Sequence, residues 1–547
     1  MFTKTASAEL DPERLARPRI AEGVAVQEPL EAGAPWVIHR GGTQYFRVQA
    51  DLARLTQALD GTKDHEELAS ALGSPWTADD VDVAVRKLAD SQMLDDGTKP
   101  KRRGRRVRFV PPLTVQFTLL RPERLLRLVL PGLRLLAGRG GAATALLCAL
   151  GGLLALALQA PAVQQALGSP LPPSTYAGVV LGVLATTVVH EMGHGAVLTY
   201  YGGRPTRMGV MLFYLSPAFF CDVSDGWRLP HKDQRVRVAL AGVGTQWVIA
   251  GAAALTSLLI EPSTLCDGLV IFAIVTYGSG LLNLLPFVKL DGYLALMSHL
   301  DIPHLRDRAM TDGRRALARI LFGGRYEREL PQLPWAAPYG VICLAFPLYL
   351  VVMAANLWGS AFLSMGAAGA SLLLFGLGFL AYHLGRGAVG LAREALKAGA
   401  RLWRICAVGL CAVALATACA TLVHLPYTLT GGYTVRDDGR TELLLPTSAD
   451  RSLVRSGARV RLVRSGVTMQ KQTGTATVAG EQAAAATAPL SMLLPVRTQA
   501  LPMPVISYPL DVAAISQDRT GTALLDAGSR PLGEWLYVKY VAPAVRW

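Results

Sequence analysis

Long apolar runs alternate with short polar segments through the middle of the chain. A helix needs about 20 mainly apolar residues to cross the hydrocarbon core of a bilayer. The runs that reach this length are 141–160, 176–200, 236–260, 267–288, 337–357, 361–383 and 404–424. The pattern therefore predicts a mainly α polytopic membrane protein, with about seven transmembrane helices in a domain that spans residues 141–424.

Lys and Arg gather in every second segment between these runs. The segments that carry several basic residues are 201–235, 289–336 and 384–403. The segments that carry none are 161–175, 261–266 and 358–360. Because basic loops favour the cytoplasmic side of a membrane, we predict a cytoplasmic N-terminus. The first residues lack the apolar core of a signal peptide, and an odd number of crossings then makes residues 425–547 extracytoplasmic.

The N-terminal residues 1–98 are polar and mixed in charge, and short β-type stretches precede helical patterns. The strands and helices predicted here are Val24–Val26, Trp36–Ile38, Tyr45–Val48, Ala50–Leu59, His65–Leu72 and Thr77–Leu94. Small strands followed by three helices are typical of a winged-helix α+β domain. We therefore predict a small cytoplasmic winged-helix domain ahead of the membrane.

Residues 99–140 are first basic and then amphipathic. The run KPKRRGRRVRF (99–109) is followed by RPERLLRLVLPGLRLL (121–136), in which arginine and leucine alternate in short blocks. We interpret this segment as a basic linker and an interfacial helix that lies on the membrane surface. A solvated charge run before the first span is the alternative.

The last part of the chain, 425–547, is rich in Thr, Val, Gly and Ser. Patches of alternating polarity, such as ARVRLVRSG, are separated by Gly and Pro, which predicts an all-β domain. The low-complexity stretch AGEQAAAATAP (479–489) is predicted to be a loop.

The formal net charge of +14 is compatible with nucleic-acid binding or with an anionic membrane surface. The Lys and Arg residues cluster beside the apolar runs, so membrane lipid is the predicted partner and no nucleic acid is expected. Five of the seven cysteines lie inside apolar runs, which indicates neither a disulfide framework nor a CxxC metal site.

The second apolar run contains the stretch TTVVHEMGHGAVL (186–198), which carries ionisable side chains into the membrane. On a helix, His190 and His194 project from one face and can reach the same zinc ion, while Glu191 lies beside them to hold a water molecule. Ionisable residues within a span are functional by default. The alternative is a histidine pair whose hydrogen bonds are satisfied inside a helix bundle.

A catalytic zinc site needs a third protein ligand and one open position. The fourth run ends in NLLPFVKLDGY (283–293), where Asp291 is the best candidate. The alternation of loops brings Asp291 to the same side and a similar depth as HEMGH, and Pro286 breaks the helix beside it. The alternative for Asp291 is an ordinary Asp-Gly turn.

These two motifs resemble those of the site-2 protease class of zinc intramembrane proteases. The motif positions that match are His190, Glu191, His194, Asn283, Pro286, Leu290, Asp291 and Gly292. The resemblance implies that zinc is bound by His190, His194 and Asp291, that Glu191 is the general base, and that Asn283 contacts the substrate. One departure is AGVGTQW (241–247), where the class has a Gly-Pro pair and an Asn.

The stretches 218–242 and 290–310, with the Arg/Leu segment, are similar to a group of peptide zinc metalloproteases found beside peptide-modification enzymes in bacteria. Residues 41–72 resemble the winged-helix element that binds the leader of ribosomal precursor peptides. A leader is then expected to add as a strand beside Tyr45, Phe46 and Val48. The resemblance implies a multi-pass protein of the bacterial cytoplasmic membrane, with peptide-modifying enzymes or a transporter as further partners.

Together these features predict an intramembrane zinc endopeptidase that removes the leader of a ribosomally made precursor, with daptide-type maturation as one pathway. The substrate is expected to lie as an extended strand near GVMLFYLSP (209–217). One alternative is a site-2 protease that releases a membrane-tethered regulator. Another is a non-catalytic export or immunity adaptor with a vestigial zinc site.

Overall fold

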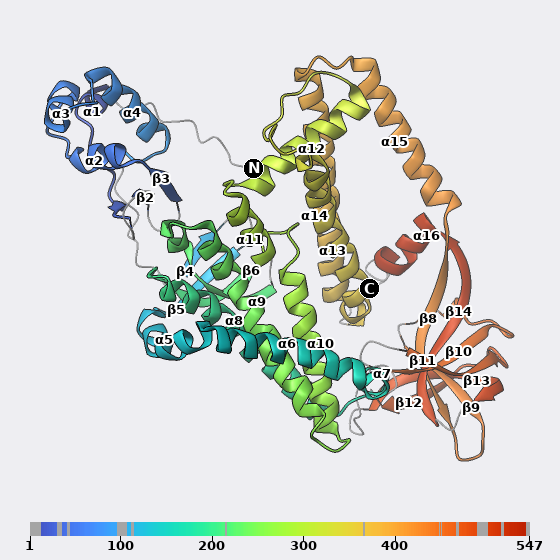
Figure 1. Ribbon diagram of the computed structural model, residues 1–547. Helices are drawn as coiled ribbons and strands as arrows, with labels where there is room; N and C mark the ends of the chain where they lie inside the picture. The colour runs from blue at the N-terminus through green and yellow to red at the C-terminus, as the bar shows by residue number, and fades with distance from the viewer. Residues whose placement is uncertain are drawn as a thin grey trace.

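The computed structural model shows a small N-terminal part, a helical middle part and a C-terminal sheet, one after another along the chain (Figure 1). The residues that it describes are 12–29, 36–40, 44–95, 107–110, 114–213, 216–364, 367–447, 449, 451–466, 470–489, 502–515 and 519–542. The basic run at 99–106 therefore lies outside the described residues.

The N-terminal part packs short helices against a three-stranded antiparallel sheet of order β1-β2-β3. Its elements are α1 (Pro12–Ala16), β1 (Val24–Gln27), β2 (Trp36–Arg40), β3 (Gln44–Val48), α2 (Ala50–Ala58), α3 (His65–Leu72) and α4 (Ala78–Asp90). Ile38 of the sheet, Leu55 of α2 and Val85 of α4 share one buried core. The strands and helices agree with the predicted ones to within a few residues, while the winged-helix assignment stays a prediction.

Seven helices in the described chain are long and apolar enough to cross a membrane, as the hydrophobic pattern predicted. They are α6 (Arg139–Leu158), α8 (Pro173–Tyr200), α9 (Lys232–Ser257), α10 (Thr264–Asn283), α13 (Ala336–Ser364), α14 (Ala367–Lys397) and α15 (Leu402–Leu422). None of the most apolar window of α15 is buried inside the protein, as expected for a helix surrounded by lipid. The chain is compatible with a polytopic membrane protein.

Several helix ends differ from the predicted span boundaries. Helix α10 ends at Asn283 rather than at 288, shortly before Pro286, which disfavours a helical conformation at the residue before it. Helix α13 includes the predicted loop 358–360 and runs to Ser364. Helix α14 continues to Lys397, through much of the predicted basic loop 384–403. Hydropathy falls where arginines begin, but the hydrogen bonds of a helix do not require apolar side chains.

The segment 99–140 contains more than the predicted linker and interfacial helix. Its amphipathic stretch forms α5 (Glu123–Ala137), but two strands, β4 (Val107–Val110) and β5 (Thr114–Leu120), precede it. They join β6 (Met208–Phe213) and β7 (Ser216–Cys221) in an antiparallel sheet of order β4-β5-β6-β7. The described residues of the stretch 209–217 therefore belong to β6 and β7, in a sheet whose other half comes from before the first span.

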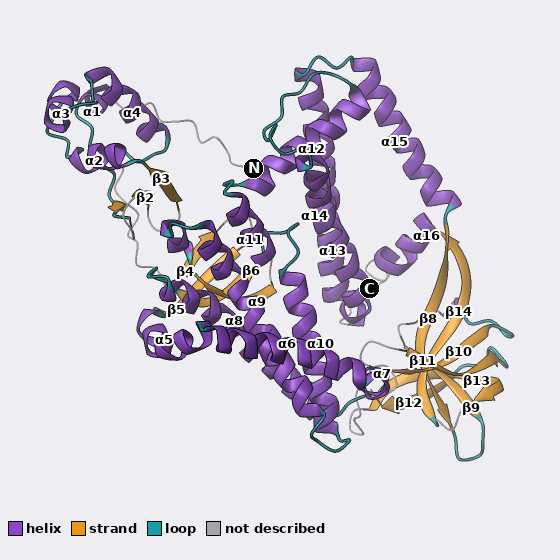
Figure 2. Cartoon of the chain, in the orientation of Figure 1, coloured by secondary structure: helices purple, strands orange, loops and turns teal. Residues whose placement is uncertain are grey.

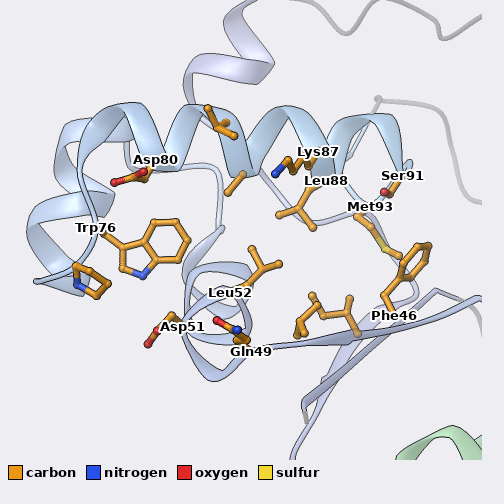
Figure 3. A pocket seen from close by; sticks show the side chains of 15 residues that line it. Phe46, Gln49, Asp51, Leu52, Trp76, Asp80, Lys87, Leu88, Ser91 and Met93 are labelled. Carbon is orange, nitrogen blue, oxygen red and sulfur yellow. The ribbon is translucent and has the colours of Figure 1, made fainter. Parts of the chain in front are cut away.

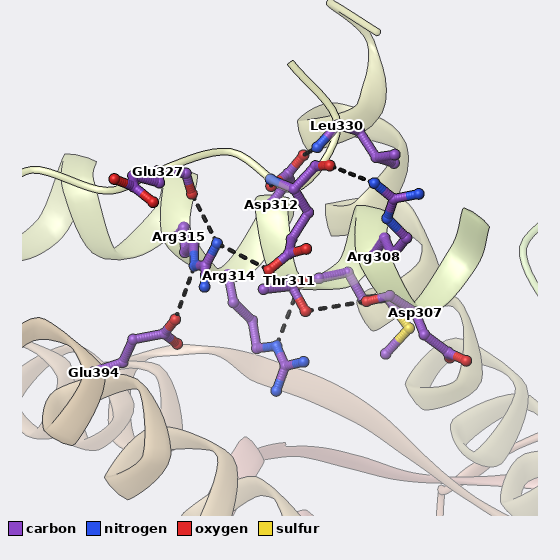
Figure 4. Close-up of polar contacts among 11 residues, drawn as sticks. Asp307, Arg308, Thr311, Asp312, Arg314, Arg315, Glu327, Leu330 and Glu394 are labelled. Atoms are coloured by element: carbon purple, nitrogen blue, oxygen red, sulfur yellow. Dashed lines mark hydrogen bonds and ion pairs between the residues drawn. The ribbon is translucent and has the colours of Figure 1, made fainter. Parts of the chain in front are cut away.

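Shorter elements connect the spans. They are α7 (Ala160–Gly168), the 3₁₀ turn η1 (Ser224–Arg228), α11 (Asp291–Leu300) and α12 (Leu305–Phe322). Helix α12 packs against α13, α14 and α15, and its polar side chains tie it to the segment that precedes α13 and to α14 (Figure 4). Arg315 of α12 bonds to Glu394 of α14, and the Asp312 carboxylate accepts the backbone N–H groups of Glu329 and Leu330.

The C-terminal part contains the predicted β structure (Figure 2). Its strands are β8 (His424–Val435), β9 (Thr441–Pro446), β10 (Arg459–Ser465), β11 (Gln470–Val478), β12 (Ala484–Pro489), β13 (Pro502–Ile515) and β14 (Thr520–Pro531). The order is β11-β10-β14-β8-β9-β13-β12, and an added β11–β13 pairing closes the sheet on itself around a core that includes Tyr433 and Leu462. Residues 484–489, predicted as a loop, form β12, and the chain continues into α16 (Leu532–Leu536), which was not predicted.

Glycine allows α6 and α9 to approach closely. An added Cβ at Gly251 would overlap the backbone of Cys148 and Ala149 on α6. The Tyr277 hydroxyl of α10 donates a hydrogen bond of 2.6 Å to the Ala149 carbonyl at the same level. Small residues at helix contacts are the usual means of close packing within a membrane. The close contact between α6 and α9 therefore stabilises the helix bundle that contains the candidate site.

We expect Gly251→Ala to lower the midpoint of thermal unfolding in detergent. The new methyl group would overpack the α6–α9 contact, which typically costs about 1–3 kcal/mol. This should exceed the gain of about 1 kcal/mol in helix propensity from Gly to Ala. Gly244, on the same helix with open space around its Cβ position, supplies the matched control Gly244→Ala. Equal stability of the two variants would contradict the close contact.

Candidate metal centre and its cavity

Helix α8 carries two buried histidines on one face. His190 and His194 are 4% and 5% exposed, and their Nε2 atoms are 3.1 Å apart. Their spacing of one helical turn brings both rings to the same point, as the motif predicts. Glu191 follows His190 and lies half-buried beside them.

The first residue of α11 meets this pair. The Asp291 Oδ2 atom lies 3.1 Å from His190 Nε2, and its Oδ1 atom lies 3.3 Å from His194 Nε2. One nitrogen or oxygen atom from each of the three residues lies within 4.8 Å of the other two. Two segments that are far apart in the sequence therefore bring two imidazoles and a carboxylate together.

The break between α10 and α11 makes this meeting possible. Helix α10 ends at Asn283, residues 284–290 leave the helical path around Pro286, and α11 begins at Asp291. Gly292 is required at the return, because a Cβ there would overlap the carbonyl group of Leu284. The Pro and Gly of the motif thus have structural roles on either side of Asp291.

Helix α9 fixes the orientation of His194. The Nδ1 atom of His194 lies 2.7 Å from the Val238 carbonyl oxygen, which can only accept a hydrogen bond. In the neutral ring, Nδ1 therefore carries the proton and Nε2 presents a lone pair to His190 and Asp291. Such a second hydrogen bond is typical of a metal-binding histidine. Gly242 of α9 lies against both rings, and a Cβ there would come within 2.5 Å of each.

The donor set fits a zinc ion. With bonds of about 2.0–2.1 Å at tetrahedral angles, neighbouring donor atoms of zinc are about 3.3–3.4 Å apart. The three contacts among His190, His194 and Asp291 are 3.1 to 3.3 Å. Asp291 Oδ2 is buried, and its contact with His190 Nε2 at 3.1 Å does not have the angles of a regular hydrogen bond. These atoms face one point, where either a bound cation or a proton on an imidazole Nε2 atom would offset the repulsion between lone pairs and the carboxylate.

Glu191 lies where this donor set meets the edge of the sheet. Its Oε2 atom accepts the backbone N–H of Cys221 at 2.8 Å, at the end of β7. Among the described strands, β7 pairs only with β6 and so forms the edge of the sheet. The stretch 209–217, where we expected the substrate, thus contains most of β6, which is internal, and the first two residues of β7, the edge strand nearest the candidate site.

A cavity of about 540 Å³ opens beside Glu191, His194 and Asp291. Its apolar walls include Met211, Phe220, Val238, Leu294 and Met297. Its polar walls include Arg207, Asp222, Trp227 and Arg235. A mainly apolar cavity with a few convergent polar groups is the usual form of a site for an organic ligand.

The N-terminal part touches the rim of this cavity through β3. Arg47 donates to the Trp227 carbonyl at 3.2 Å and pairs with Asp301 at 3.1 Å. Arg235 of α9 pairs with the same carboxylate at 2.7 Å. Sequence analysis did not predict this contact, because it joins four elements through single side chains and no local pattern links one element to another.

The other face of β3 lines a groove of about 500 Å³ within the N-terminal part (Figure 3). Phe46 and Val48 contribute to it, as do Leu52, Trp76 and Met93. Because side chains alternate along a strand, Arg47 points away from the groove while Phe46 and Val48 line it.

The residues that we predicted to contact the substrate lie in different parts of the structure. Phe46 and Val48 line the N-terminal groove. Tyr45 belongs to β3, but its side chain lies outside the described residues. Asn283 is the last residue of α10, half-buried, and is not part of the lining of either cavity. Among the residues that sequence analysis missed, Cys221 and Val238 act through backbone atoms, which no side-chain pattern reveals.

No protein-family model, curated protein or solved structure matches this chain.

Asp222 organises the turn after β7. Its carboxylate accepts hydrogen bonds from Ser224, Thr206 and Arg207. Burial by itself would raise the pKa of Asp222, but the hydrogen bonds from Ser224 and Arg207 outweigh it and hold the pKa below its ordinary value of 3.8. The carboxylate therefore stabilises the folded protein in its charged form.

We expect Asp222→Asn to lower stability by about 1–3 kcal/mol at neutral pH, because buried partners lose a charged acceptor. A lowered pKa gives stabilisation that is present above the unfolded-state value and is lost as the pH falls through the folded-state value. The difference from the wild type should therefore shrink below about pH 4. Thermal unfolding across pH measures it, with the exposed Asp233→Asn as control. A difference that is independent of pH would contradict this role.

Proposed function

We propose that this chain is an intramembrane zinc endopeptidase that cuts a ribosomally made precursor peptide and removes its leader. The convergence of His190, His194 and Asp291, with Glu191 beside them, is the observation that carries this proposal. Two histidines and a carboxylate with one open position are a known ligand set for catalytic zinc. The likeness of both motifs to the site-2 protease class agrees with it.

His190, His194 and Asp291 would hold the zinc ion. A bound zinc ion would polarise the scissile carbonyl and lower the pKa of a water molecule towards about 7. Glu191 would take a proton from the attacking water and pass it to the departing amine. A C–O bond forms and the peptide C–N bond breaks, which yields one new carboxyl terminus and one new amino terminus.

The free edge of β7 suggests how a substrate is presented. The peptide bonds of a helix are already hydrogen-bonded and are protected from attack, so the substrate must be extended. A strand added to β7 would pair its backbone with an edge that ends at Cys221, next to Glu191. Within the expected stretch 209–217, the proposed docking site is therefore on the side of β7 rather than of the internal β6.

The N-terminal groove is the proposed site for the leader. It is lined by apolar side chains on one face of β3, whose other face contacts the rim of the cavity through Arg47. A leader bound in the groove would thus be held beside the candidate site. This favours precursor processing over release of a membrane-tethered regulator. Membrane lipid, peptide-modifying enzymes and a transporter remain the proposed partners, with the N-terminal part cytoplasmic and residues 425–547 extracytoplasmic.

We expect Glu191→Gln to reduce cleavage by about 10²–10⁴-fold, because it removes the general base while keeping the shape of the side chain. The measurement is mass spectrometry of a short ribosomal precursor encoded beside this chain, incubated with the purified protein in detergent. Zinc content and thermal stability should remain those of the wild type.

Glu261→Gln, which changes an exposed glutamate in the loop between α9 and α10, is the matched control and should cut normally. Unchanged maturation of the precursor by Glu191→Gln would favour the non-catalytic export or immunity adaptor instead.

Removal of the metal should also abolish cleavage. Dialysis against a strong zinc chelator should empty the site, because zinc that is held by three side chains can dissociate and exchange with the solution. Addition of stoichiometric Zn²⁺ should restore activity, whereas Mg²⁺, which prefers six oxygen ligands, should not. Full activity in metal-free protein would rule out the proposed chemistry.

A further inference from the structure

The segment between α10 and α11 has lost the hydrogen bonds of a helix. The backbone carbonyl groups of residues 284–290 must accept hydrogen bonds from other protein groups, since lipid offers no donors. Two of these carbonyls, on Pro286 and Phe287, accept hydrogen bonds from side chains of later elements. They lie only a few residues before Asp291.

Tyr339 of α13 reaches the first of them. Its hydroxyl donates to the Pro286 carbonyl at 2.6 Å, and the residue is 7% exposed. Its ring also lies 6.2 Å from that of Phe287, centroid to centroid. The tyrosine therefore holds the segment both by a hydrogen bond and by packing.

Arg306 of α12 reaches the second carbonyl. Its Nε donates to Phe287 at 2.9 Å, and its Nη2 donates to the Cys343 carbonyl of α13 at 3.4 Å. One guanidinium thus ties the segment to both α12 and α13. Helix α12 is itself held by the polar contacts around Asp312 and Arg315 (Figure 4). Helix α12, which carries Arg306, is therefore itself held in place by its neighbours.

We infer that Tyr339 and Arg306 are positioning residues that hold Asp291 in reach of His190 and His194. This inference rests on the proposed role of Asp291 as a zinc ligand. It assigns a function in the site to α12 and α13, which contribute none of the three ligands. Without the hydrogen bonds from Tyr339 and Arg306, the segment 284–290 would adopt other conformations. The Asp291 carboxylate would then lie beside the two imidazoles for a smaller fraction of the time.

Tyr339→Phe tests the inference, because it removes one hydroxyl and keeps the ring. We expect the zinc affinity of the purified full-length protein to fall by about 10–100-fold, the usual effect of losing a group that orients a ligand. The visible absorption spectrum of the Co²⁺-substituted protein should change as well. Tyr349→Phe, on the same helix with a side chain that is 58% exposed, is the matched control and should behave as the wild type.

A second readout does not depend on metal. Hydrogen exchange of the backbone amides in 284–294 should be faster in Tyr339→Phe than in Tyr349→Phe, while exchange in the C-terminal sheet should be equal. Arg306→Lys, which keeps the charge but loses the two-way contact, should show a similar local increase. A general loss of stability would instead raise exchange throughout the protein and would overturn the inference.

The outcomes separate the inference from the proposed function. If the wild type binds one zinc ion and Tyr339→Phe binds it equally well, the positioning role is wrong and the proposed function stands. If the wild type binds no zinc, the proposed function fails, and hydrogen exchange decides the positioning role by itself. Unchanged exchange in 284–294 would then overturn it, and faster exchange there would sustain it.

Discussion

The organisation of the middle part depends on one electrostatic constraint, the burial of two imidazoles and a carboxylate that face the same point. His190 and His194 are almost fully buried. Their Nε2 atoms lie 3.1 Å apart, and each lies 3.1 to 3.3 Å from a different oxygen of the Asp291 carboxylate. Burial of such groups is unfavourable unless each has a partner. A cation at their common point would satisfy all three at once, and this is the basis of the proposed metal centre.

Every neighbouring element contributes to this arrangement. Helix α9 supplies the Val238 carbonyl that orients His194 and the glycine that leaves room for both rings. The interruption after α10 turns the chain so that α11 begins with Asp291. The sheet brings the N–H group of Cys221 to Glu191, and among the described strands it ends there with β7. In the proposed function, a peptide laid along β7 would present its backbone to the Glu191 carboxylate and to the candidate metal site together.

Much of this could be predicted from local patterns. The spacing of His190 and His194 follows from the helical period, and the match in depth with Asp291 follows from the alternation of spans. The four-stranded sheet could not be predicted, because it pairs β5 with β6 across two membrane helices, and each strand is too short to be recognised alone. The contact of Arg47 with Trp227 depends on how separate parts dock, which periodicity does not encode. Helix ends were misplaced where polarity changed but backbone hydrogen bonding continued.

X-ray absorption spectroscopy at the zinc edge tests the central claim most directly, on the full-length protein purified without added metal. The account predicts one zinc ion per chain, with a first shell of two imidazole nitrogens and carboxylate or water oxygen, and no sulfur. In Asp291→Ala, any zinc ion that is retained should still have two imidazole nitrogen ligands but fewer oxygen ligands. A shell that contains cysteine sulfur, or protein that retains no zinc at all, would contradict the account.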